Sequence, residues 1–334
     1  MANPTSHHRA GGGYQNPWPD TSLSGFGHFL KWRLVERRNH PIAPNPARDS
    51  LPRRQPSIAT PRAEHGNRSV TWIGHSTTLL QLGPVNVLTD PIWSERASPF
   101  QWLGPRRLMS PGLEFDALPP LDVVLLSHNH YDHLDEATVR RIAGRFPGTP
   151  WLCPLGLGQL LHSFGVRQVI ERDWWHSFHT STFSATCAPA QHFSARWIGD
   201  RNDTLWCSWV IQADGVRVFF AGDTALHPAF TEIGARLGAF DLVMLPIGAY
   251  EPRWFMRRVH MNPEDAVAAY RALVDGAPAT APCFAMHWGT FRLTDEPVDE
   301  PPVRFAQRWR EAGLPASANW TLAHGETRRL FESH

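Results

Sequence analysis

Four potential metal ligands directly follow a short apolar run, and this arrangement constrains the fold more than any other sequence feature. The run Val123–Leu126 has the length and composition of a strand buried on both faces. The cluster behind it contains His128, His130, Asp132 and His133. Residues i and i+2 at a strand end share a side, so the first two imidazoles point to one place, while the last two ligands begin the turn into a helix. Imidazole and carboxylate suit a divalent cation such as zinc, so the cluster predicts a metal site rather than solvated loop histidines.

Three further candidate ligands also follow predicted strands. The pairs of strand and ligand are Phe183–Pro189 with His192, Val216–Phe220 with Asp223, and Cys283–Met286 with His287. Taken singly, each histidine could be a core residue and the aspartate part of a turn. All of them end strands, as the first cluster does, and a pair of metal sites needs about seven to eight donors. Together the seven residues therefore predict a binuclear centre.

The remaining pattern alternates short β runs with helices. Asp214-Gly215 separates two apolar runs and is a strong signal for a β-hairpin. Asn262-Pro263 has the cap and first-turn proline of a helix start, and Asp135 is a candidate cap of an earlier helix. Further strands are expected at Val70–Ile73, Thr77–Leu82, Val85–Thr89, Thr204–Gln212 and Leu242–Leu245, and helices at Asp135–Phe146 and Val303–Ala312. This mixture predicts an α/β fold, an αββα sandwich, in a domain spanning residues 69–334.

Residues 1–68 differ from the rest because prolines are dense, which predicts an extended N-terminal segment. Within it, Leu23–Arg38 is expected to form one amphipathic helix, with Phe26, Leu30 and Leu34 on its apolar face. Two interpretations are open for this helix. It packs on the main domain, or it lies in a lipid interface.

Composition excludes several classes of protein. Of the 334 residues, 42% are hydrophobic and 19% are charged, which indicates a globular chain. The formal net charge of +1 provides no global field, so we expect no nucleic-acid partner. No apolar run approaches the ~18 residues of a membrane span, and the N-terminus lacks the apolar region of a signal peptide. The four cysteines are widely spaced, as is typical of isolated thiols in a reducing compartment. We therefore expect a cytoplasmic protein.

The ligand pattern resembles that of the metallo-β-lactamase superfamily. Other motifs are similar to those of the N-acylphosphatidylethanolamine-hydrolysing phospholipases D and their bacterial relatives, and the similarity extends over nearly the whole chain. These motifs include Tyr14 to Pro19, Trp72 to Thr77, Leu88 to Pro91, Gly104 to Arg107, Ser127 to Leu134, Asp173 to Trp175, Phe220 to Thr224, Pro246 to Met256 and His287 to Phe291.

The resemblance implies how the ligands divide between two zinc ions, with iron or manganese as alternative metals. One ion would be held by His128, His130 and His192, and the other by Asp132, His133 and His287. Asp223 would bridge both. The resemblance also implies a phospholipid substrate, peripheral contact with the inner face of a membrane, and a homodimer.

Two adjacent divalent cations can share a hydroxide that attacks phosphorus, and Asp132 is placed to ligate a metal and accept the proton of the water. The leading hypothesis is thus a zinc-dependent phosphodiesterase of phospholipase D type. A lactonase or other hydrolase on the same scaffold is the alternative, because fold does not fix substrate. A metal-stabilised lipid-binding protein without turnover is the third interpretation.

Further residues are expected around the metals. His260 precedes a helix N-terminus, where backbone N–H groups and an imidazolium could hold a phosphate or protonate the leaving group. Tyr131 is a candidate substrate contact by resemblance, with a packing role as the alternative. His75 and Asp90 are candidates to orient metal ligands. Four tryptophans are expected in loops near the strand ends, as lipid-facing residues or as loop anchors: Trp93, Trp102, Trp197 and Trp254.

Overall fold

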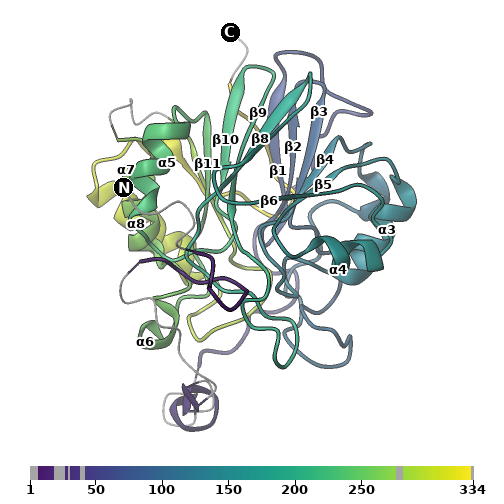
Figure 1. Cartoon of the computed structure of the whole chain (residues 1–334). Coiled ribbons are helices and arrows are strands. Elements are labelled where there is room, and N and C mark those ends of the chain that lie inside the picture. The colour runs from purple at the N-terminus through teal and green to yellow at the C-terminus, as the bar shows by residue number, and fades with distance from the viewer. Residues whose placement is uncertain (1–6, 19–26, 29–30, 38–41, 276–280, 332–334) are drawn as a thin grey trace.

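The computed structural model describes residues 7–18, 27–28, 31–37, 42–275 and 281–331. Within these residues, two seven-stranded mixed sheets lie face to face, and helices cover the outer face of each (Figure 1). The predicted αββα sandwich is confirmed. No helix in this part of the chain has the length and apolar character needed to cross a membrane.

The first sheet has the strand order β14-β1-β2-β3-β4-β5-β6. Strands β3 to β6 run parallel to one another, while β14, β1 and β2 pair in antiparallel fashion. The bounds are β1 Arg68–Gly74, β2 Thr77–Leu82, β3 Val85–Thr89, β4 Val123–Leu125, β5 Trp151–Pro154, β6 Val169–Arg172 and β14 Thr327–Arg329.

The second sheet has the order β13-β12-β11-β10-β9-β8-β7, with β10 to β13 parallel. The hairpin between β9 and β10 turns at Asp214 and Gly215, whose φ angles are 48° and 77°, as the Asp-Gly signal predicted. The bounds are β7 Ser177–His179, β8 Phe183–Ala188, β9 Ser208–Ala213, β10 Val216–Phe220, β11 Leu242–Pro246, β12 Cys283–Met286 and β13 Asn319–Trp320.

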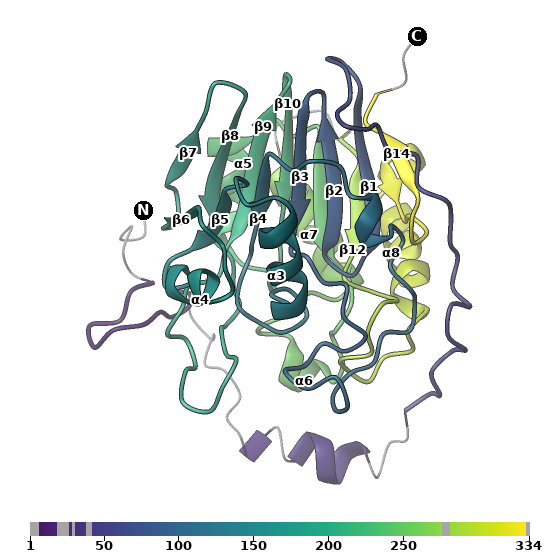
Figure 2. The ribbon, with the colours of Figure 1, turned by 90° about the vertical axis from the view of Figure 1, so that its right-hand side faces the viewer.

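Helices α3 and α4 cover the first sheet, and α5, α7 and α8 cover the second (Figures 1 and 2). The short helix α6 and the described turn η1 lie together below the sandwich in both views. The bounds are η1 Lys31–Glu36, η2 Phe115–Ala117, α3 Glu136–Arg145, α4 Gly158–Ser163, α5 Ala229–Leu237, α6 Arg253–Met256, α7 Pro263–Leu273, α8 Glu300–Glu311 and η3 Ala316–Ala318.

Strand β4 shows how the core positions the first ligand cluster. Val123 and Leu125 belong to the apolar cluster between the two sheets, whereas Val124 and Leu126 pack in the cluster beneath α3. All four side chains are completely buried. The chain leaves this fixed strand directly into Ser127, so the ligands that follow start from a rigid base.

Some element boundaries differ from those expected. β9 begins at Ser208 rather than Thr204, and α8 begins at Glu300 because its prolines occupy the first turn. Asp135 stands at the cap position of α3, but its carboxylate accepts hydrogen bonds from Ser94 and Thr138 instead of the helix backbone.

The predicted helix Leu23–Arg38 lies partly outside the described residues. Its described turn, η1, contacts the main body through Trp32, whose ring lies 5.3 Å from that of Phe255 and whose indole N–H donates to Asp295. Leu34 of the predicted apolar face is exposed. The described turn is therefore packed on the body through Trp32, with the adjacent Arg37 paired to Asp295, while an apolar side chain remains open to solvent.

Candidate metal centre

The candidate ligands converge at the carboxyl ends of the parallel strands. The cluster His128–His133 follows β4, Asp223 follows β10 and His287 follows β12, while His192 lies in the segment after β8. Parallel neighbouring strands bring their carboxyl ends to one edge of each sheet, and the two sheets face each other. The structure therefore brings together all seven ligands predicted from the sequence.

The first group contains His128, His130 and His192. His130 Nδ1 lies 2.8 Å from His128 Nε2 and 3.1 Å from His192 Nε2. Burial lowers the pKa of all three imidazoles, to about 3 for His130 and about 4 for His192, so the neutral rings keep a lone pair for a metal. This group has the donor set of a zinc site with three protein ligands.

The second group contains Asp132, His133 and His287, with His75 beside them. Asp132 Oδ2 lies 3.4 Å from His133 Nε2 and 3.6 Å from His287 Nε2. His75 Nε2 lies 2.8 Å from the same oxygen. His75, a candidate from the sequence to orient metal ligands, is thus placed to orient the carboxylate of Asp132.

Asp223 lies between the two groups. Its Oδ2 is 3.1 Å from the Nε2 atoms of both His133 and His287. The same oxygen is 3.9 Å from His192 Nε2 and 4.0 Å from His128 Nε2. One carboxylate therefore faces both sets of imidazoles, which is the placement required of a bridging ligand.

The electrostatics of the second group fit a bound cation. Burial raises the pKa of Asp132 and Asp223, but the charge on His133 and the hydrogen bonds from His133 and His287 together outweigh it and hold both carboxyls well below their usual range. Burial lowers the pKa of His287, yet Asp223 and Asp132 together outweigh it and raise the value to about 9. The buried carboxylates thus require positive charge, which protonated rings supply here and divalent cations can supply when the rings bind metal.

Buried polar atoms without a partner support the same conclusion. Among the described residues, Nε2 of His133, Nε2 of His287 and Oδ1 of Asp223 are buried and make no hydrogen bond. Unpaired buried polar groups are costly and point to a missing partner such as an ion. The donor set and these atoms fit a pair of divalent cations.

Asp90 orients two ligands at once. Its Oδ2 lies 2.7 Å from His133 Nδ1 and accepts a hydrogen bond from the Ser127 hydroxyl at 2.6 Å. That hydroxyl also lies 2.8 Å from His128 Nδ1. Asp90 therefore orients the His133 ring directly and the His128 ring through Ser127. This is the role expected of a residue that orients metal ligands.

The carbonyl oxygen of Val259 is a partner that sequence analysis missed. It lies 2.8 Å from His192 Nδ1 and orients that ring toward the centre. A backbone carbonyl is present at every residue, so no sequence signal distinguishes this one.

Several residues at the centre have left-handed backbone conformations. The φ angles are 55° for His75, 31° for Asp90 and 63° for His287. Such angles cost a non-glycine residue about 1–3 kcal/mol, and they persist only where the surroundings enforce them. The strained residues are the ones whose side chains must reach the centre from the ends of β1, β3 and β12.

His260 lies at the centre, although not in the manner expected. Its Nδ1 is 3.9 Å from Asp223 Oδ2, and its ring is 5.0 Å from that of His192. Burial lowers its pKa well below the usual value, which favours the neutral imidazole over the expected imidazolium. In the capping box of α7 the Asn262 side chain accepts from the Asp265 backbone N–H, so this N–H, one of those expected to hold an anion, already has a partner.

Tyr131 packs against the loop after β8. Its hydroxyl donates to the Arg196 carbonyl at 2.9 Å, and the Arg196 guanidinium lies 4.0 Å from its ring centroid. Arg196 also donates to the carbonyls of Asn129 and Leu134, at 2.8 and 2.7 Å. These contacts hold the ligand-bearing loop and give Tyr131 a packing role in the structure.

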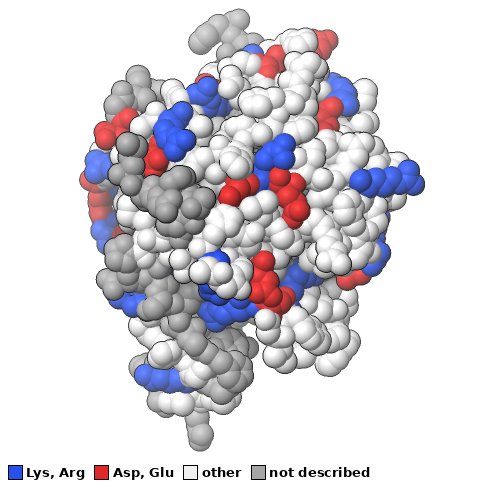
Figure 3. Space-filling model, viewed as in Figure 1, with Lys and Arg blue, Asp and Glu red and all other residues white. Residues whose placement is uncertain are grey.

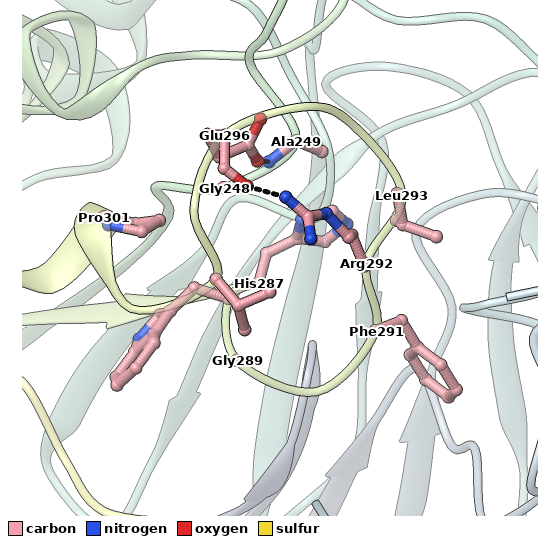
Figure 4. A pocket seen from close by; sticks show the side chains of 11 residues that line it. Gly248, Ala249, His287, Gly289, Phe291, Arg292, Leu293, Glu296 and Pro301 are labelled. Atoms are coloured by element: carbon pink, nitrogen blue, oxygen red, sulfur yellow. Dashed lines mark hydrogen bonds between the residues drawn. The ribbon is translucent and has the colours of Figure 1, made fainter. Parts of the chain in front are cut away.

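Access to the centre is one-sided. The side chain of Asp132 is 13% exposed, and His130 is also partly exposed, whereas the other ligands are buried. On another side of His287, residues including Gly248, Phe291 and Glu296 line a cavity of about 20 Å³ (Figure 4). That volume accommodates about one water molecule. A substrate must therefore reach the centre from the side of His130 and Asp132.

Residues 85–288 match the β-lactamase superfamily domain. Three proteins are similar in sequence to this chain over at least two thirds of its length. The uncharacterized protein Rv0906 of Mycobacterium tuberculosis is 44% identical over 83% of this chain and 72% of its own length. N-acyl-phosphatidylethanolamine-hydrolyzing phospholipase D 1 of Caenorhabditis elegans is 39% identical over 67% of this chain. The mitochondrial N-acyl-phosphatidylethanolamine-hydrolyzing phospholipase D of Saccharomyces cerevisiae is 32% identical over 69% of this chain.

The match spans 64% of the C. elegans protein and 49% of the yeast protein. Among solved structures, the metallo hydrolase Igni18 of Ignicoccus hospitalis aligns with a TM-score of 0.59 at 22% identity. That alignment covers 80% of this chain and all of Igni18, and it shows a shared fold.

Proposed function

Because the chain belongs to the β-lactamase superfamily and is a metal-dependent hydrolase by homology, we propose that it is a binuclear zinc phosphodiesterase of phospholipase D type. The substrate would be an N-acylphosphatidylethanolamine or a related phospholipid. The observation that carries the proposal is the position of Asp223 between two groups of metal-binding side chains. The names of the C. elegans and yeast relatives favour the phospholipid substrate.

The proposed reaction is hydrolysis of the P–O bond between the phosphatidyl group and the N-acylethanolamine. Two bound divalent cations supply Lewis acidity toward phosphate oxygens and bring the pKa of water toward neutrality. Asp132, the ligand carboxylate that solvent reaches, accepts the proton of the attacking water. His260 in its neutral form retains one N–H, which donates to a phosphate oxygen or to the leaving oxygen. We also propose that Tyr131 contacts the substrate on the open side of the centre, next to His130 and Asp132.

Exposed apolar side chains support contact with a lipid surface. Most of those described lie in the segments that follow Asp90 after β3 and His192 after β8, and on η1 and α6. Ile198 is 95% exposed and Trp102 is 73% exposed. The other members of this set are Leu34, Val35, Phe100, Leu103, Trp197 and Trp254, whereas the exposed Leu226, Val303 and Phe331 lie elsewhere. Aromatic and aliphatic side chains of this kind partition into the interfacial region of a bilayer. Trp93 does not belong to this set, because it is buried and donates to the Leu113 carbonyl.

The face shown in Figure 3 gives no indication of a nucleic-acid site among the described residues. On the face shown in Figure 3, basic and acidic side chains of the described residues are interspersed, without a broad basic area. This agrees with the formal net charge of +1. A peripheral membrane location and a homodimer remain part of the proposal, and vesicle flotation and light scattering measure them.

The experiment that tests the proposal is hydrolysis of N-acylphosphatidylethanolamine in water enriched in oxygen-18. Attack on phosphorus places the label in phosphatidate and releases an unlabelled N-acylethanolamine, as mass spectrometry would show. Label in the N-acylethanolamine would contradict the mechanism. A panel of lactones assayed beside the phospholipid tests the alternative activity. Hydrolysis of lactones without phospholipid turnover would replace the proposal by a lactonase, and binding to vesicles without any hydrolysis would indicate a lipid-binding protein.

A further inference from the structure

A second cluster of metal-binding side chains lies outside the candidate centre, where the N-terminal strap meets the body of the protein. The strap comprises residues His7–Trp18. It is fastened by a hydrogen bond from the Tyr14 amide to the Asn202 carbonyl at 2.8 Å. The ring of Trp18 stacks on His227, with centroids 4.5 Å apart. These contacts give the strap a defined position on the protein.

Two consecutive histidines of the strap meet one carboxylate of the body. His7 Nε2 lies 2.6 Å from Asp173 Oδ1, and His8 Nε2 lies 2.8 Å from Asp173 Oδ2. The His7 ring is buried and stacks on Trp174 with centroids 4.1 Å apart, which fixes its plane. The His8 side chain is 37% exposed, so one side of the cluster is open to solvent. Three donors converge, and water can reach a further position.

The ligand atoms of His7, His8 and Asp173 all lie within 4.8 Å of one another, as do those of each ligand group in the candidate centre. In that centre, contacts between ligand atoms range from 2.8 Å, between His128 and His130, to 4.0 Å, between His128 and Asp223. Two imidazoles and one carboxylate with an open position form a donor set that suits zinc. Neighbouring residues of an extended chain would point to opposite sides. The turn of the strap instead brings both Nε2 atoms to Asp173.

We propose that His7, His8 and Asp173 form a third, peripheral zinc site that fastens the N-terminal strap to the protein. The strap also contacts the candidate centre at one point. Asn16 of the strap donates its side-chain N–H to the carbonyl oxygen of His192 at 2.9 Å. A cation at the peripheral site therefore stabilises a segment that contacts the backbone of a candidate ligand. The site acts as a structural staple and takes no part in the reaction.

The test compares zinc bound per chain in the full-length protein and in a His7→Gln/His8→Gln variant. Glutamine keeps an N–H that can donate to Asp173 but is a poor zinc ligand. The variant therefore distinguishes a zinc site from hydrogen bonds that fasten the strap without a metal. Both proteins are stripped with chelator, loaded with zinc, passed through a desalting column and measured by mass spectrometry of the metal. We expect the variant to hold one zinc equivalent fewer than the wild type. Equal zinc contents would overturn the site, whatever the occupancy of the candidate centre.

His65→Gln is the matched control. His65 Nδ1 lies 2.8 Å from Asp214 Oδ1, which makes a histidine–aspartate pair without a second histidine. This variant should bind as much zinc as the wild type, and loss of one equivalent from it would overturn the assignment.

A second measurement uses trypsin, which cleaves after the exposed Arg9 of the strap. Zinc should slow cleavage after Arg9 in the wild type and have no effect on it in the His7→Gln/His8→Gln variant. Equal protection of both proteins would contradict the proposal.

Discussion

Asp90 Oδ2 lies 2.7 Å from Nδ1 of His133, and both side chains are completely buried. Burial raises the pKa of the Asp90 carboxyl, against the opposing effect of His133 and Ser127. The pair holds the His133 ring with Nε2 toward Asp132 and Asp223. The orientation of His133 thus depends on a carboxylate at the end of β3, the strand that pairs with β4 in the first sheet.

Replacement of Asp90 by asparagine tests this dependence. The amide keeps the shape of the side chain but has one oxygen in place of two to serve both Ser127 and His133. We expect zinc affinity and kcat/KM each to fall by about 10- to 100-fold. Competition with a chromophoric chelator measures the affinity. Asp241→Asn is the control, because Asp241 accepts from the Arg217 amide next to the start of β11, and its loss should leave zinc affinity unchanged.

Asp132→Asn should abolish turnover while leaving the fold intact. The amide cannot accept the proton of the attacking water, and it removes a negative charge from the second ligand group. Release of N-acylethanolamine measures activity, and circular dichroism measures the fold. Asp116→Asn, at a side chain that is 92% exposed, should behave as the wild type. Equal activity of the Asp132 variant would defeat the role given to this residue.

Gly222 is required for the approach of β10 to the first ligand cluster. Its φ is +60°, and a Cβ there would lie 2.4 Å from Ser127 Cβ. We expect Gly222→Ala to lower the free energy of unfolding by about 1–3 kcal/mol and to reduce zinc affinity by displacing Ser127. Gly144→Ala is the matched control in α3, where an added Cβ meets nothing within 4 Å. That variant should gain about 0.5–1 kcal/mol. Chemical denaturation compares the two.

Glu264 links α7 to α8 and makes stability depend on pH. Burial raises its pKa, but hydrogen bonds from Arg304 and Arg308, each 2.8 Å long, outweigh burial and lower the pKa below 4.5. The folded state therefore holds the proton less tightly than the unfolded state. Its stabilising contribution is present above about pH 4.5 and is lost as the pH falls through the lowered pKa.

Glu264→Gln should accordingly destabilise the protein at pH 7 by up to about 1 kcal/mol and have a smaller effect at acid pH. Urea denaturation at several pH values measures this difference. Glu232→Gln, which breaks an exposed pair with Arg236 within α5, should have the smaller effect at pH 7. If Glu264→Gln destabilised the protein more at acid pH than at pH 7, the predicted direction of the pH dependence would be contradicted.

The fold and the convergence of the candidate ligands were predictable because these residues follow apolar runs. Val123–Leu126 is buried on both faces, and the chain then enters His128, so strand and ligand are read from one stretch of sequence. The peripheral cluster was missed because His7 and Asp173 are 166 residues apart and neither marks the end of a helix or a long apolar run. The part played by the Val259 carbonyl depends on backbone position, which the residue type does not encode. His260 was selected from its place before a helix N-terminus, but its protonation depends on burial that only the packed structure reveals.

We propose that seven side chains hold two divalent cations, one on either side of Asp223. Anomalous diffraction from crystals of the zinc-loaded protein, collected above and below the zinc absorption edge, locates these cations. We expect two strong peaks, one among His128, His130 and His192 and one among Asp132, His133 and His287, with the Asp223 carboxylate between them. A single peak, or no peak at either position, would contradict this proposal.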